Sequence, residues 1–171
     1  MRPSFEQGPI RPPSEAGSLL IRVSRNCPWT RCAFCRTYKN VKFELRSVDE
    51  ILRDIDSMSE ITEALKELSI RQGGRGLITE AVVQAVFDRY PGFDEHHRSI
   101  ALWLYHGGES VFLQDADSLV MKTDDIVTIL RHIRDAFPSV RRITTYCRSK
   151  TAARKSVQEL RSLREAGLAR I

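Results

Sequence analysis

The order of local patterns along this chain constrains its fold more than any single motif. Short apolar runs rich in branched residues, typical of strands, are each followed by polar residues and then by an amphipathic segment with helical spacing. A strand, a loop and a helix repeated in this order are typical of a parallel sheet with its polar loops at one edge. The expected strands are 18–24, 110–114 and 142–147, with a further one beginning at Leu168.

Capping residues place the helices between these strands. Two helices are expected to open on a capping box, one formed by Ser47 with Glu50 and one by Ser156 with Glu159. A Gly in the left-handed conformation commonly ends a helix. The first expected helix starts after Ser47, and the second follows Thr79 and stops at Tyr90-Pro91. The third is capped by Thr123 and ended by Pro138. The fourth starts after Ser156 and is closed by Gly167.

The segment between the first two expected strands is longer than one crossover needs. Near its end is an apolar run, 100–105, which His106-Gly107-Gly108-Glu109 separates from a second apolar run, 110–114. Only the second run has the continuous apolar character of a parallel-sheet strand. Because the Gly-Gly-Glu sequence precedes that strand, we expect it in a turn at the amino end of the strand, with a solvated carboxylate.

Length and composition predict one domain. Residues 1–17 hold four prolines and two glycines and are expected to form an irregular lead-in, and 18–171 the folded part. A closed eight-unit barrel takes roughly 250 residues. With 171 residues, we therefore expect an α/β fold that is a partial parallel (β/α) barrel, truncated after about three βα units and poorly active by itself.

Charge and hydropathy exclude some classes of protein. Both signs of charge are interspersed, so a formal charge of +5 does not by itself indicate nucleic acid. No apolar stretch reaches the ~18 residues of a membrane helix, and the first residues lack the apolar core of a signal peptide. We therefore expect a cytoplasmic protein with no membrane partner.

Three of the four cysteines form the pattern C-x4-C-x2-C at Cys27, Cys32 and Cys35, directly after the first expected strand. Such clustering of soft ligands favours zinc or an iron-sulfur cluster over disulfides. Three thiolates without a nearby fourth ligand suit a cluster with one iron left open. His96 and His97 are expected to be solvated loop residues.

Two alternatives remain for the cysteines. The same spacing occurs in plant-type [2Fe-2S] proteins, where Cys147 would supply the fourth ligand, although an apolar neighbourhood makes Cys147 a better small buried residue. A zinc site is the other alternative. Both would make the chain a non-catalytic binding module.

Residues 11–39, with Cys-Pro-Trp-Thr-Arg-Cys-Ala-Phe-Cys at their centre, resemble a group of bacterial and archaeal radical S-adenosylmethionine (SAM) proteins of unassigned substrate. The resemblance continues through 111–120 and 156–171. Most of that superfamily has three residues between the first two cysteines, and this chain has four.

The resemblance implies a radical SAM enzyme with a partial barrel of that type. Cys27, Cys32 and Cys35 would bind three irons of a [4Fe-4S] cluster, and SAM would bind the fourth and yield a 5'-deoxyadenosyl radical. An electron donor of the flavodoxin or ferredoxin type would be required. The substrate and reaction do not follow from the sequence.

The resemblance also implies candidate SAM contacts. Phe34 would lie against adenine, with a core aromatic under the loop as the alternative. After the second strand, Asp117 is the first candidate and Asp115 the second for the SAM ammonium, although capping would also explain Asp115. Arg148 and Ser149 are weaker candidates, with a solvated loop as the alternative. Three cations near the cysteines would stabilise a negatively charged cluster or be ordinary surface charge: Arg31, Arg36 and Lys39.

Overall fold

A four-stranded parallel sheet forms the centre of the computed structural model, which describes residues 3–88 and 92–171. Its strands lie in the order β1-β4-β5-β6. Each of these four strands is therefore next to the one that follows it along the chain. The predicted α/β class is confirmed. In the part of the chain described, the sheet is open and does not close into a barrel. The strands are β1 (Leu19–Arg22), β4 (Ser110–Gln114), β5 (Arg142–Thr145) and β6 (Leu168–Arg170).

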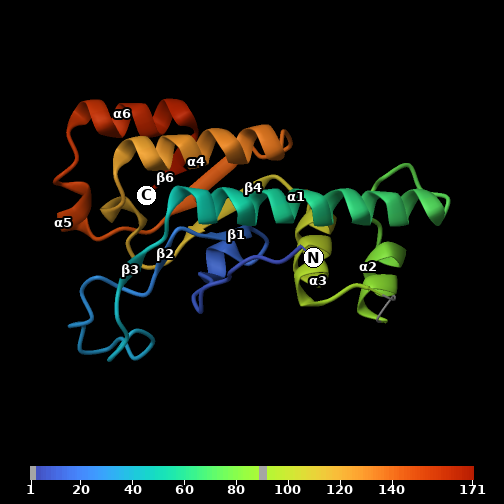
Figure 1. Cartoon of the computed structure of the whole chain (residues 1–171), viewed down its shortest axis with the longest axis horizontal. Helices are drawn as coiled ribbons and strands as arrows, with labels where there is room; N and C mark the ends of the chain where they lie inside the picture. The colour runs from blue at the N-terminus through green and yellow to red at the C-terminus, as the bar shows by residue number, and fades with distance from the viewer. Residues whose placement is uncertain (1–2, 89–91) are drawn as a thin grey trace.

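Helices cover one face of this sheet. Figure 1 shows α6, α4 and α1 side by side, and α3 and α2 beneath the far end of α1. Alternate strand residues, such as Ile21, Leu113 and Ile143, are buried in the same apolar core as these helices. The helices are α1 (Val48–Arg71), α2 (Glu80–Phe87), α3 (Glu95–Tyr105), α4 (Thr123–Ala136), α5 (Ser149–Ala152) and α6 (Val157–Ala166).

The expected start signals agree with the helix starts in three of four cases, including Thr79 at the cap position of α2. Both capping boxes form, at Ser47 before α1 and at Ser156 before α6, and Gly167 ends α6 at φ 115°. The expected cap at Thr123 is wrong, because Lys122 occupies the cap position and Thr123 is the first residue of α4. The Thr123 hydroxyl instead donates a hydrogen bond to Glu159, 2.7 Å away. The expected stop of α2 at Tyr90-Pro91 lies outside the described residues.

The histidine pair was predicted wrongly as solvated loop. His96 and His97 lie in the first turn of α3, which begins at Glu95, and the apolar run 100–105 forms the end of the same helix. His97 is buried, and its Nδ1 lies 2.7 Å from the Asp94 carboxylate that caps the helix. An imidazole here takes the place that Glu or Gln usually has in a capping box.

The Gly-Gly-Glu sequence lies at the amino end of β4, as expected. Gly107 and Gly108 form a turn between α3 and β4, both with positive φ, and Glu109 precedes the amino end of β4. The Glu109 side chain is exposed and pairs with Arg141 at 3.3 Å. It is therefore a solvated carboxylate at the end of the sheet opposite to the cysteine loop.

The lead-in crosses the uncovered side of the sheet. Within its described residues 3–17, the only regular element is the 3-10 helix η1 (Pro13–Glu15). The Gln114 side chain accepts a hydrogen bond from Gly8 N at 2.9 Å and donates one to the carbonyl of Ile10. The buried Glu15 pairs with Arg142 of β5 at 3.1 Å. Residues 5–15 are thus part of the packed structure.

In the described ranges, no helix is both long and apolar enough to cross a membrane.

Candidate functional site

The cysteines lie in a loop that a short antiparallel pair closes. β2 (Ser24–Arg25) follows β1 almost directly and pairs with β3 (Glu44–Leu45), so residues 26–43 leave and return at the carboxyl end of β1. Asn26 begins the loop with φ 70°, and its side-chain amide donates a hydrogen bond to Lys42 O at 2.7 Å. Strands of two residues are too short to show a periodic pattern, so the sequence did not predict β2 and β3.

Cys27, Cys32 and Cys35 lie around one small cavity of about 20 Å³, together with Thr30, Tyr38 and Lys39. All three thiols are free and partly buried. In the described chain, no three Cys, His, Asp or Glu side chains already stand close enough together to hold a metal ion. The loop therefore gathers three soft donors without fixing them in a ligating geometry.

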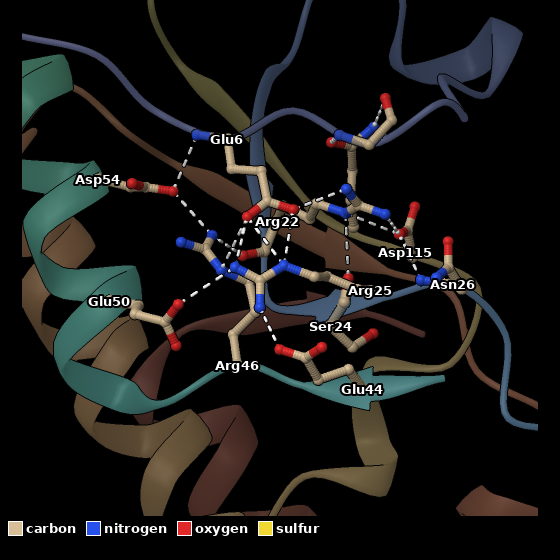
Figure 2. Close-up of polar contacts among 12 residues, drawn as sticks. Glu6, Arg22, Ser24, Arg25, Asn26, Glu44, Arg46, Glu50, Asp54 and Asp115 are labelled. Carbon is tan, nitrogen blue, oxygen red and sulfur yellow. Dashed lines mark hydrogen bonds and ion pairs between the residues drawn. The ribbon is translucent and has the colours of Figure 1, made fainter. Parts of the chain in front are cut away.

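A network of three arginines and several carboxylates supports the start of this loop (Figure 2). Glu6 lies at its centre, with its carboxylate 2.7 Å from Arg22 and 2.7 Å from Arg25. Arg46 contacts Asp54 of α1 at 2.7 Å. Arg25 also pairs with Glu44 and Glu50. The lead-in, the carboxyl end of β1, the β2–β3 pair and α1 are joined by these contacts.

Asp115, one residue beyond β4, is fully engaged in this network. Its carboxylate lies 2.8 Å from Arg22 Nη2, accepts a hydrogen bond from the Tyr38 hydroxyl at 2.6 Å, and accepts another from Asn26 N at 3.1 Å. The side chain is completely buried. Asp115 therefore fastens the cysteine loop to the sheet, and does not cap a turn as the alternative interpretation supposed.

Charge and burial shift the pKa of two members of the network. Hydrogen bonds from Arg25, and the charges of Arg46, Arg25 and Arg22, hold the pKa of Glu6 below its ordinary value against the opposing effect of burial. Burial, and then the hydrogen bond to Asp115, raises the pKa of Tyr38 far above its ordinary value. Glu6 is therefore ionised and Tyr38 is a neutral donor at pH 7.

Asp117 differs from Asp115 in its partners. It is wholly buried, and its Oδ2 accepts a hydrogen bond from Thr151 of α5 at 2.6 Å. Its Oδ1 is buried and has no hydrogen-bond partner among the described residues. A buried carboxylate oxygen without a donor is rare in proteins and indicates a place for a ligand or a water molecule.

The segment after β5 reaches the cysteine loop through Arg148. This arginine is half-buried, and its guanidinium lies 4.0 Å from the centre of the Trp29 ring. A solvated loop therefore does not describe Arg148. Ser149 is exposed and is the first residue of α5. Phe34 is 88% exposed, so the alternative that it is a core aromatic under the loop is wrong.

Cys147 is not grouped with the other three cysteines. It is half-buried, packs against the core, and lines a separate cavity of about 360 Å³ with Phe112, Thr144 and Glu15. Burial raises the pKa of its thiol. Cys147 is therefore only half-buried where a buried residue was expected, although it does pack against the apolar core.

Tyr38, Arg22 and Trp29 belong to the site and were missed from the sequence. Their partners lie on other strands or loops, so no local spacing signals them. Together, the parallel α/β sheet, the cysteine loop at its carboxyl edge and the buried Asp117 define the site. Comparison with protein families, with curated proteins and with solved structures finds no match to this chain.

Proposed function

We propose that this chain is a radical SAM protein, in which Cys27, Cys32 and Cys35 bind three irons of a [4Fe-4S] cluster and SAM binds beside it. The observation that carries the proposal is the position of three free cysteines in one loop at the carboxyl edge of a parallel sheet. Ligand sites of parallel α/β proteins lie at that edge. When bound, the cluster supplies the electron that cleaves SAM and generates a 5'-deoxyadenosyl radical.

The donor set fits such a cluster in its chemistry. Three thiolates select zinc or iron over hard cations, and no fourth Cys or His lines their cavity among the described residues. A structural zinc site would require a fourth ligand for tetrahedral closure. Three thiolate donors would instead leave the fourth iron of a [4Fe-4S] cluster free to bind the amino and carboxylate groups of SAM.

The orphaned oxygen of Asp117 supports a cationic ligand group near the same edge. A carboxylate accepts strong hydrogen bonds from an ammonium, and Oδ1 has no other donor in the described chain. Asp115 has its donors already, which makes Asp117 the better contact for the SAM ammonium. Phe34, Arg148 and Ser149 remain candidates for further contacts to SAM.

The sheet order agrees with a partial barrel. Strands that are adjacent in the order β1-β4-β5-β6, with α1, α4 and α6 on one face, are arranged as in one wall of a (β/α) barrel. The proposal therefore includes a partial barrel of the radical SAM type and an electron donor of the flavodoxin or ferredoxin type.

Anaerobic reconstitution with iron and sulfide, followed by electron paramagnetic resonance (EPR) of the reduced protein, tests the proposal. We expect a [4Fe-4S] signal that changes when SAM is added. Cys32→Ser should abolish the cluster, whereas Cys147→Ser, the matched control, should retain it. Asp117→Asn should retain the cluster and weaken the response to SAM.

A [2Fe-2S] signal, or stoichiometric zinc that is indifferent to SAM, would overturn the proposal. Loss of the [2Fe-2S] signal in Cys147→Ser would then identify Cys147 as the fourth ligand of a non-catalytic module.

A further inference from the structure

Positive charge is concentrated in two segments that are far apart in the sequence. Residues 26–42 and 146–155 together contain eight Lys and Arg and no Asp or Glu. The whole chain has 27 Lys and Arg against 22 Asp and Glu, so the remaining residues have 19 against 22. The overall excess of positive charge therefore comes from these two segments alone.

The fold brings the two segments together. Arg148 lies 4.0 Å above the Trp29 ring, and Arg31 lies 5.3 Å from the centre of the same ring. In Figure 1, α5 and the loop between β2 and β3 occupy the same end of the molecule. One end of the protein thus carries the cations of both segments.

Most of these cations are available to a partner. Lys155 is excluded, because it donates to Met121 O and Thr123 at 3.0 Å each. The other seven have no ion pair with a described residue, and all but the half-buried Arg148 are exposed. We call them the basic loop surface: Arg31, Arg36, Lys39, Lys42, Arg148, Lys150 and Arg154.

Exposed aromatic side chains lie among these cations. Phe34 is 88% exposed and stands between Arg31 and Arg36 in the cysteine loop, and Tyr146 is 46% exposed, two residues before Arg148. Leaving an apolar ring of this size in water costs free energy that a stacking partner would recover. Cations that follow a backbone, together with aromatic rings for successive bases, are the features of single-stranded nucleic acid sites.

We propose that the basic loop surface binds single-stranded nucleic acid, with phosphates on the cations and an unpaired base on Phe34. An acidic protein would neutralise the same cations but would leave the Phe34 ring without a specific partner. A duplex would offer phosphates and no free base face. The surface shares Phe34 and Arg148 with the candidate SAM contacts, but nucleic acid binding requires neither the cluster nor SAM. The protein without cluster and SAM therefore tests it separately from the proposed function.

Fluorescence anisotropy of a labelled 15-nucleotide RNA, titrated with the full chain under reducing conditions, measures this binding. We expect the logarithm of the affinity to fall with the logarithm of salt concentration, with a slope no steeper than about −5 for seven phosphate contacts. Unlabelled RNA and DNA single strands should compete, and a duplex or polyglutamate should compete at least about tenfold less well.

Two variants separate charge from stacking. Lys150→Glu with Arg154→Glu should weaken binding at least about tenfold at 0.1 M salt. Arg75→Glu with Arg131→Glu changes the net charge equally at exposed positions outside the surface and should have little effect. Phe34→Ala should weaken single-strand binding about tenfold. Circular dichroism of each variant checks that it remains folded.

Equal affinity for polyglutamate and RNA, with no effect of Phe34→Ala, would overturn the proposal in favour of an acidic protein partner. An equal loss in the Arg75 and Arg131 double variant would overturn it in favour of non-specific attraction.

Discussion

Asp115 and Asp117 are buried carboxylates two residues apart whose surroundings assign them different roles. Asp115 has Arg22, Tyr38 and Asn26 as partners, whereas one oxygen of Asp117 has none among the described residues. Removing one partner of a buried ion pair is more costly than removing an isolated charge. Without the Asp115 charge, Arg22 would keep only the partly exposed Glu6 as its ion-pair partner. Their substitutions should therefore have different effects.

Asp115→Asn should lower the free energy of unfolding by about 3 kcal/mol, because it removes the charge that faces the largely buried Arg22. Asp117→Asn should change it by less than about 1 kcal/mol, because an amide still accepts the Thr151 hydrogen bond. Urea denaturation of both variants measures the difference. Equal losses would contradict the assignment of Asp115 to the structural network.

At the scale of elements, the start of α1 depends on the ionised side chain of Glu50. Hydrogen bonds from the Ser47 backbone, the Ser47 side chain and Arg25 lower the pKa of Glu50 to about 2 from 4.5. A pKa that is lower in the folded state means that the carboxylate stabilises the fold above pH 4.5 and loses this effect as the pH falls toward 2.

Glu50→Gln should therefore lower the free energy of unfolding at pH 7, by no more than about 1 kcal/mol because the side chain is partly exposed. The difference from the unsubstituted protein should shrink as the pH falls below 4.5. Urea denaturation at several pH values measures it, with the exposed Glu60→Gln of the same helix as the control. A difference that is independent of pH would show that the charge is not involved.

The starts of helices were predictable where the capping residues lie close together in the sequence. The boxes at Ser47 and Ser156 involve residues three apart, so the sequence displays them directly. The start of α3 was missed because His97, an unusual residue for that position, completes the box with Asp94. The cysteine spacing is equally local. Tyr38 with Asp115, and Arg148 with Trp29, pair across the fold, so only the structure reveals them.

At the scale of the whole molecule, the sequence predicted which elements form the sheet but not which residues the lead-in contacts. Prolines and glycines indicate irregular backbone correctly, yet they say nothing of what that backbone contacts. Phe5 is buried, and Glu6 contacts both Arg22 and Arg25. The lead-in thus holds together the elements that carry the cysteine loop.

Gly8 is the position where this arrangement is most sensitive to substitution. A Cβ at Gly8 would lie 2.5 Å from Oδ1 of Asp115, a carboxylate that three donors keep from moving. Gly8→Ala should therefore displace the lead-in or Asp115 and lower the free energy of unfolding by about 1–3 kcal/mol. Gly17→Ala is the matched control, because its Cβ would meet nothing closer than 3.9 Å.

Thermal or urea unfolding of the two glycine variants decides whether the lead-in supports the site. If it does, Gly8→Ala is the less stable variant, and its cysteine loop becomes more accessible, so the three loop thiols react faster with a thiol reagent than in Gly17→Ala. If both variants unfold and react alike, the lead-in does not support the loop, and the contacts of Glu6 and Gly8 contribute little to the position of the cysteines.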